Sequence, residues 1–198
     1  MVNSVKFDRQ QVIANATTLF WARGFKGCSM RDVQQAVNLR PGSLYASFGD
    51  KENLYREALL HYAAAGQASL QALEQQLACP LAVLRQFMRQ ALANSLTGQP
   101  DKVCMLVKTV TELGAEQHPL ASLARELLQQ MAAQFTRLLA QAKQAGLLAA
   151  DTDPAALASF YQMQLIGLKS VARLQPEPAV LDCLLQQALA ILPAEKAH

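Results

Sequence analysis

Hydrophobic residues recur every three or four positions through most of the chain, and short breaks rich in glycine, proline and polar residues separate these stretches. This spacing places apolar side chains on one face of a helix. The alternation of β-branched residues that is typical of strands is missing. The pattern therefore predicts an all-α protein of about nine helices, over residues 8–23, 29–37, 41–48, 51–77, 80–97, 102–113, 119–145, 154–174 and 178–192.

The first three predicted helices have clear boundary signals. Asp8 and Gln11 have the spacing of a capping box at the start of the first helix, and Gly24 fits its end. Ser29 can cap the second helix, and Pro41 suits the first position of the third. Two short helices joined by a tight turn, between two longer helices, are typical of a helix-turn-helix.

The distribution of charged residues along the chain gives a first indication of function. The chain has 198 residues, of which 52% are hydrophobic and 17% charged, so it can bury a substantial core. Residues 1–56 contain eight Lys/Arg and four Asp/Glu, whereas the remainder contains ten basic and eleven acidic residues. A basic segment joined to a nearly neutral body indicates that the front of the molecule meets a polyanion.

Other features exclude several classes of protein. The four cysteines, at positions 28, 79, 104 and 183, form no C-x-x-C pair, so free thiols are expected, without a disulfide framework or a zinc site. No other metal or cofactor is expected. No apolar run approaches the about 20 residues of a membrane span, and the N-terminus lacks the apolar middle of a secretion signal. We therefore expect a cytoplasmic protein with no membrane partner.

Residues 29–54 carry a specific motif, SMRDVQQAVNLRPGSLYASFGDKENL. It resembles the N-terminal DNA-binding domain of the TetR family of bacterial transcriptional regulators. The matching positions are Val33, Ala36, Ser43, Leu44, Tyr45, Phe48, Lys51, Glu52 and Leu54, with Phe20, Gly24 and Phe25 upstream. The resemblance implies a three-helix DNA-binding domain over residues 1–50 and a helical regulatory and dimerisation domain over residues 51–198.

A recognition helix must be short, and polar at its exposed N-terminal end, to enter a major groove about 12 Å wide. The resemblance places that helix over residues 41–48. The DNA contacts it implies are Arg31, Arg40, Pro41, Gly42, Ser43, Tyr45, Ser47 and Lys51. Ser47 stands where the family commonly has histidine, and its hydroxyl can still bond a phosphate. Tyr45 could instead be partly core, and the two arginines could be merely solvated.

Two apolar stripes near the C-terminus bear on oligomeric state. They comprise Leu157, Phe160, Tyr161, Leu165, Leu168 and Val171 in the eighth helix, and Val180, Leu181, Leu184, Leu185, Ala188, Leu189 and Leu192 in the last. In TetR-like proteins the last two helices form a four-helix bundle with those of a partner. The alternative is that these stripes face only the core of their own subunit. A two-fold operator needs two recognition helices about 34 Å apart, which favours a homodimer.

Residues 103–113, VCMLVKTVTEL, resemble a branch of the family in which a cysteine opening the sixth helix senses electrophiles or oxidants. The matching residue is Cys104. A helix N-terminus stabilises a thiolate, and Lys102 and Lys108 would add positive potential, with Lys169 as another basic candidate. Alternatively, Cys104 is a small core residue, or the signal is a small apolar ligand. Candidate lining residues for such a ligand are Phe87, Met88, Met105, Phe135, Tyr161 and Met163.

Rival functions find little support in the sequence. The nucleotide-binding, metalloprotease and hydrolase motifs are missing, and the three histidines are scattered, so an enzyme is not expected. A helical adaptor without DNA binding is the remaining alternative, against which the basic front end and the intact recognition helix argue. The sequence predicts a DNA-binding regulator, a repressor released from double-stranded operator DNA by a small-molecule or thiol-reactive signal.

Overall fold

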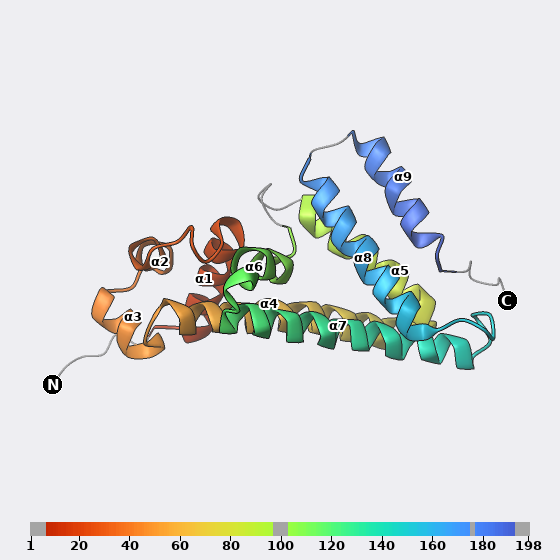
Figure 1. Ribbon diagram of the computed structural model, residues 1–198, viewed down its shortest axis with the longest axis horizontal. Helices are drawn as coiled ribbons and strands as arrows, with labels where there is room; N and C mark the ends of the chain where they lie inside the picture. Colours follow the sequence, from red (N-terminus) through yellow and green to blue (C-terminus); the bar gives the residue numbers. More distant parts are fainter. Residues whose placement is uncertain (1–6, 97–102, 175–176, 193–198) are drawn as a thin grey trace. The chain divides into compact units, whose positions relative to one another are not determined.

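The computed structural model describes residues 7–96, 103–174 and 177–192. Within these ranges the regular structure is entirely helical, which confirms the predicted all-α class (Figure 1). The α-helices are α1 (Arg9–Arg23), α2 (Met30–Val37), α3 (Pro41–Phe48), α4 (Lys51–Gln76), α5 (Pro80–Leu96), α6 (Met105–Leu113), α7 (Pro119–Gln144), α8 (Pro154–Ala172) and α9 (Pro178–Leu189), with a 3-10 turn, η1 (Gly114–Glu116).

The helix ends agree with the sequence where local capping decides them, and elsewhere differ from the predicted bounds by up to three residues. The Asp8 side chain accepts hydrogen bonds from the backbone N–H groups of Gln10 and Gln11, as a cap should. The Gln11 side chain does not reciprocate, because it donates to Asn15 one turn further along the same helix. α6 begins at Met105, later than predicted, and residues 97–102 lie outside the described part of the chain.

The chain divides into two compact units. The first unit comprises residues 1–64 and 105–125, and the second comprises residues 65–104 and 126–198. α4 and α7 therefore contribute to both units, and α6 belongs to the first. The sequence predicts a boundary between the DNA-binding and regulatory domains at residue 50. It does not predict that α6 groups with the helix-turn-helix segment.

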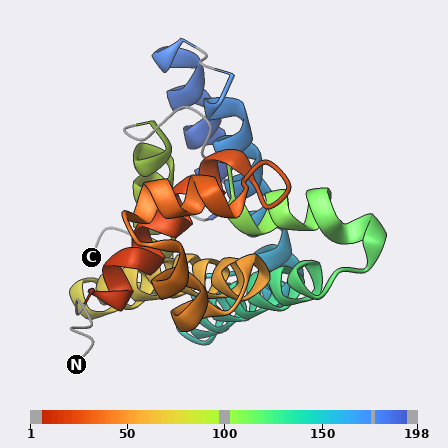
Figure 2. The same cartoon turned by 90° about the vertical axis from the view of Figure 1, so that its left-hand side faces the viewer.

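The core of the first unit is built around Tyr55 of α4, which is 1% exposed. Its ring meets those of Phe20 and Phe25 edge-on, with centroids 4.8 and 5.1 Å away. Its hydroxyl is 2.8 Å from the Thr109 hydroxyl on α6, so the buried polar end has a partner. Burial raises the pKa of Tyr55 to about 12, which keeps it neutral. Figure 2 shows the first three helices of this unit in red to orange.

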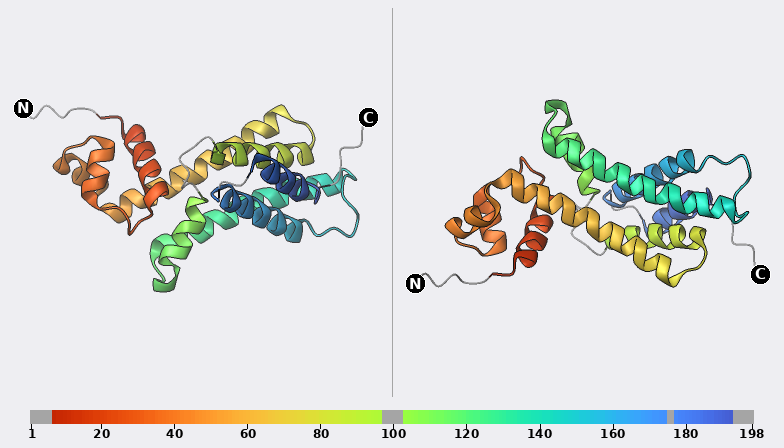
Figure 3. Two further views of the ribbon diagram at one scale, coloured as in Figure 1. Left: turned by 90° about the horizontal axis from the view of Figure 1, so that it is seen from above. Right: turned by 90° about the horizontal axis from the view of Figure 1, so that it is seen from below.

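The second unit has a larger apolar core. Phe135 of α7 and Tyr161 of α8 are fully buried, with ring centroids 4.8 Å apart, and the Tyr161 hydroxyl donates to the Leu84 carbonyl at 2.6 Å. Arg85 donates to the carbonyls of Leu189 and Leu192 at the end of α9. Figure 3 shows the long helices α4 and α7 from two sides. In the described part of the chain, every helix is too short or too polar to cross a membrane.

Candidate nucleic-acid interface

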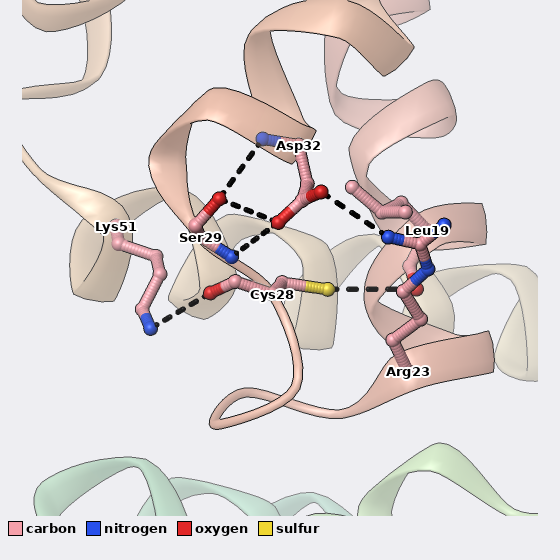
Figure 4. Close-up of polar contacts among 6 residues, drawn as sticks. All are labelled: Leu19, Arg23, Cys28, Ser29, Asp32 and Lys51. Atoms are coloured by element: carbon pink, nitrogen blue, oxygen red, sulfur yellow. Dashed lines mark hydrogen bonds and ion pairs between the residues drawn. The ribbon is translucent and has the colours of Figure 1, made fainter.

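The helix-turn-helix segment starts from a complete capping box (Figure 4). The Ser29 hydroxyl accepts from the Asp32 backbone N–H at 3.2 Å, and the Asp32 carboxylate accepts from the Ser29 N–H at 2.8 Å. The Ser29 hydroxyl and backbone N–H are the main cause that lowers the pKa of Asp32, and Arg23, at 3.3 Å, acts in the same direction. These bonds fix the start of α2.

The turn between α2 and α3 is set by its backbone conformation. Asn38 adopts the left-handed region, with φ of 51°, which asparagine tolerates better than most residues. α3 then begins with Pro41 at its first position. Leu44 and Phe48 bury one side of α3 in the first unit. The opposite side of this short helix consequently faces outwards.

That outward side carries most of the predicted DNA contacts. Side chains of Arg31 on α2 and of Arg40, Pro41, Gly42, Ser43 and Tyr45 at α3 are exposed, whereas Ser47 and Lys51 are half-buried. Tyr45 is 47% exposed, so it is not a core residue of this chain. The structure thus brings six of the eight predicted residues to the surface of the α2–α3 segment.

Neither packing within the described chain nor backbone conformation requires a glycine at position 42. A Cβ atom built at this position would have no neighbour within 4 Å. Its φ is not positive, so the backbone does not demand glycine either. Glycine within a helix costs about 0.5–1 kcal/mol relative to alanine. Gly42 therefore leaves open space at the exposed tip of α3, where an outside partner can approach the backbone closely.

The structure places Lys51 differently from the other predicted contacts. Its ammonium group donates to the carbonyls of Phe25 and Cys28, at 3.1 and 3.0 Å, and lies 4.1 Å from the centroid of the Phe25 ring. Figure 4 shows its bond to Cys28. Two of the three ammonium protons are therefore used within the first unit, and the charge also lies against an aromatic ring.

Cys104, the predicted sensing residue, is half-buried and directly precedes α6. Of the two lysines expected to support it, only Lys108 belongs to the described part of the chain. Lys102 lies outside the described residues, and the Lys108 ammonium binds the carbonyls of Trp21 and Ala22. The amine near Cys104 belongs to Lys169 of α8. Burial lowers the pKa of Lys169, and negative charge on Cys104 acts in the opposite direction.

The residues predicted to line an apolar ligand site do not form one group. Phe87, Met88, Phe135 and Tyr161 pack into the core of the second unit. Met105 is buried in α6, whereas Met163 is 55% exposed on α8. Among the described side chains, no three His, Cys, Asp or Glu gather where they could hold a metal ion.

The two C-terminal stripes divide into an inner and an outer part. Most predicted members, including Tyr161, Leu165 and Leu168 of α8, are buried in the core of their own chain. Other large apolar side chains remain exposed on this part of the molecule: Phe160 at 41%, Met163 at 55%, Leu174 at 78% and Val180 at 49%. The predicted apolar stripes therefore combined residues of a buried face with residues of an exposed face.

Comparison with known proteins decides the family. Residues 12–58 match the family described as bacterial regulatory proteins, tetR family, and residues 80–188 match the tetracyclin repressor-like C-terminal domain. The chain belongs to the TetR family. As a TetR-family protein it is a DNA-binding transcriptional regulator and not an enzyme, which confirms both predictions.

Named TetR relatives match along nearly the whole chain. The HTH-type transcriptional repressor ComR of Escherichia coli (strain K12) is 29% identical over 187 residues, covering 92% of this chain and 86% of ComR. A solved structure of a cysteine mutant of the regulator CifR, complexed with 26-bp double-strand operator DNA, is 30% identical with a TM-score of 0.79, covering 94% and 98% of the two chains. E. coli NemR in its reduced form is 20% identical, covers 96% and 99%, and has a TM-score of 0.79.

Two charged residues of α6 that bind the backbone around the end of α1 were missed or misassigned from sequence. Glu112 was not singled out, and Lys108 was assigned to Cys104. Their spacing of four residues on one helix face was the available signal. The sequence could not reveal that both side chains bind the backbone around the end of α1, because this depends on how α6 packs within the first unit.

Proposed function

We propose that this TetR-family regulator is a repressor that binds two-fold operator DNA as a homodimer and leaves it when a signal reaches the regulatory helices. The main observation that supports α3 as the DNA-reading helix is its open, exposed tip around Gly42. Repression is supported by the similarity to ComR, a transcriptional repressor, and operator binding by the similarity to CifR bound to its operator.

The proposed contacts fall into two groups. Pro41, Gly42 and Ser43 bring the α3 backbone close to a groove, while Arg31 and Arg40 supply charge for a guanine edge or a phosphate. Tyr45, Ser47 and Lys51 are proposed phosphate contacts. Residues 1–50 thus read DNA in this proposal, and residues 51–198 regulate and dimerise.

The proposed dimer interface lies on the outer face of α8 and α9. Large apolar side chains, among them Phe160, Met163 and Val180, are exposed there in the single chain. Gly167 lies on the same helix as Phe160, and a Cβ at that position would meet nothing within 4 Å. An apolar surface with room for close helix approach supports pairing with a second copy.

For the signal, we propose reaction of the Cys104 thiol with an electrophile or oxidant. Half-buried Cys104 is accessible enough to react, and the buried amine of Lys169 lies close enough to interact with its charge. The thiolate is the reactive form of a cysteine side chain. A small apolar inducer is the second candidate, without a gathered set of lining residues to support it.

DNA binding is tested with a labelled fragment from upstream of the protein's own gene, titrated by fluorescence anisotropy at several salt concentrations. We expect saturable binding that weakens as salt rises, because released counterions accompany each phosphate contact. Loss of binding even at low salt, or affinity independent of salt, contradicts operator binding.

The signal is tested by adding N-ethylmaleimide, which forms a thioether with a thiolate, to the protein–DNA complex. We expect release from DNA in the wild type and in Cys183→Ser, which removes the exposed cysteine, but not in Cys104→Ser. Equal release in all three proteins would refute Cys104 as the sensor. A parallel screen of apolar compounds tests the second candidate.

A further inference from the structure

Lys108 of α6 binds the end of α1. Its ammonium donates to the carbonyl oxygens of Trp21, at 3.2 Å, and of Ala22, at 2.7 Å. Carbonyl groups in the last turn of a helix lack intrahelical partners and form the negative end of the helix dipole. Lys108 therefore supplies donors and positive charge to carbonyl groups in the last turn of α1.

Glu112 of α6 binds the chain immediately after α1, in the segment of residues 24–29 that we call the α1–α2 connection. Its Oε2 accepts from the Phe25 backbone N–H at 3.0 Å, and its Oε1 accepts from the Lys26 N–H at 2.6 Å. Consecutive backbone N–H groups that point the same way form an anion-binding concavity. Each carboxylate oxygen thus satisfies one N–H group of the connection.

Gly24 makes this contact possible. Its φ of +79° lies in the region that favours glycine. A Cβ atom on Gly24 would also lie only 2.6 Å from Glu112 Oε2. A larger residue at position 24 would consequently strain the backbone and also displace the Glu112 carboxylate.

The two charged residues define the register between α6 and α1. They lie four residues apart, so they share one face of α6. The cation meets carbonyls and the anion meets N–H groups, so sliding α6 along its axis would break both sets of bonds. From α4, Lys51 holds the carbonyls of Phe25 and Cys28. The connection held in this way ends at Ser29, the cap from which α2 starts.

We propose that Glu112 and Lys108 are positioning residues for operator binding. By fixing the α1–α2 connection they set the direction in which α2, and with it α3, leaves the body of the first unit. Neither side chain touches DNA in this proposal. The inference rests on the proposed operator binding and adds to it two residues outside the helix-turn-helix segment.

The test compares Glu112→Gln with Glu116→Gln. Both substitutions remove one negative charge from the first unit, and electrostatics alone would make both variants bind DNA slightly more tightly. Glu116 is the matched control, because its carboxylate is exposed and its ion pair is with the side chain of Lys26 and not with the backbone of the connection. The glutamine at position 112 would turn an NH₂ group towards one of the two N–H groups, which leaves that donor without an acceptor.

We expect Glu112→Gln to bind the upstream DNA fragment about tenfold more weakly, and Glu116→Gln to bind as tightly as the wild type or slightly more tightly. Affinity for a scrambled fragment of equal length should not fall, and the slope of affinity against salt should stay the same, because no phosphate contact is lost. Circular dichroism at the assay temperature verifies that both variants are folded, since a merely structural role would appear as partial unfolding and not as lost specificity.

Lys108→Met gives a second, independent variant should Glu112→Gln not fold. It removes a positive charge, so simple electrostatics lowers binding to both DNA fragments alike, whereas lost positioning lowers binding to the upstream fragment more. The inference is overturned if folded Glu112→Gln or Lys108→Met keeps the wild-type ratio of specific to non-specific affinity. If the wild type itself shows no specific binding, it is the proposed function that fails.

Discussion

The two units expose opposite kinds of surface, although both are built from helices alone. The first unit presents polar and small residues at the tip of α3, whereas the second presents large apolar side chains such as Phe160 and Met163 on α8. Each surface includes a helical glycine, Gly42 or Gly167, that has no neighbour in its own chain. The difference supports the proposed partners, which are DNA for the first unit and a second copy of the protein for the second.

The interiors differ in the same way. In the first unit, charged side chains of α4 and α6 bind backbone groups of the α1–α2 connection. In the second, Phe135 and Tyr161 lie at the centre of an extended apolar cluster. Directional hydrogen bonds fix geometry, while apolar burial supplies most of the stability. Loss of these side-chain-to-backbone bonds in the first unit should therefore alter binding, and loss of apolar contacts from the cluster in the second should alter stability and assembly.

The largest effect on stability is expected in the second unit. Phe135→Ala removes a fully buried ring and leaves a cavity, which should lower the free energy of unfolding by about 3–5 kcal/mol. Urea denaturation followed by circular dichroism measures the change. Gln130→Ala, at an exposed position of the same helix, is the control and should change it by less than about 0.5 kcal/mol. A loss below about 1 kcal/mol for Phe135→Ala would contradict the assigned core.

The exposed apolar surface of the second unit is tested by Phe160→Glu. Burying this charge in the proposed dimer interface should weaken association by about 100-fold or more. Sedimentation velocity over a dilution series should then show monomer where the wild type is dimeric. Gln130→Glu adds the same charge on α7 and should leave the dimer intact. A Phe160→Glu variant that stays dimeric would show that the dimer interface does not include this face of α8.

The exposed glycine of the first unit is tested by adding bulk. Gly42→Val should reduce affinity for the upstream DNA by about tenfold or more, with a smaller loss for Gly42→Ala, because the side chain keeps the backbone from the groove. Thermal stability should not fall, and should rise slightly for Gly42→Ala, since the added Cβ meets no described neighbour and glycine is the poorer helix former. Ala133→Val, an exposed site on α7, should affect neither property. Equal affinity for Gly42→Val would exclude close approach at this position.

The smallest effect concerns the cap of α2. Because the pKa of Asp32 is lowered in the folded state, the ionised carboxylate contributes stability above its unfolded-state pKa of about 3.9. That contribution is lost as pH falls through the lower folded-state value. We expect Asp32→Asn to melt slightly below the wild type at pH 7, and the difference between the two to shrink at strongly acid pH. A difference that grows on acidification would contradict this account of the cap.

Local signals in the sequence predicted the helices well. The Ser29 cap, the Gly24 stop and Pro41 lie where the structure has helix ends, because each acts through backbone groups within one turn. The start of α6 was predicted less accurately, since no capping residue marks it. Local chemistry therefore sufficed for the architecture that presents the candidate interface.

Features that depend on packing between distant elements could not be predicted in the same way. The direction of the Lys108 side chain, towards α1 and away from Cys104, follows from the docking of α6. Likewise, apolar spacing on α8 cannot separate buried Tyr161 from exposed Phe160, because adjacent residues both fit a broad stripe. The recognised motif identified the helix that we propose to read DNA, whereas the α6 side chains that hold the α1–α2 connection and the exposed face of α8 became apparent only in three dimensions.

The central claim is that a homodimer of this protein reads DNA through two copies of α3. Hydroxyl-radical footprinting of the protein on the DNA upstream of its gene tests this claim most directly. The account predicts two protected half-sites related by two-fold symmetry, with centres about one helical turn, 34–36 Å, or a multiple of it apart. Protection in Gly42→Val should vanish at the same protein concentration. A single unpaired footprint, or protection that shows no preference for sequence, would contradict it.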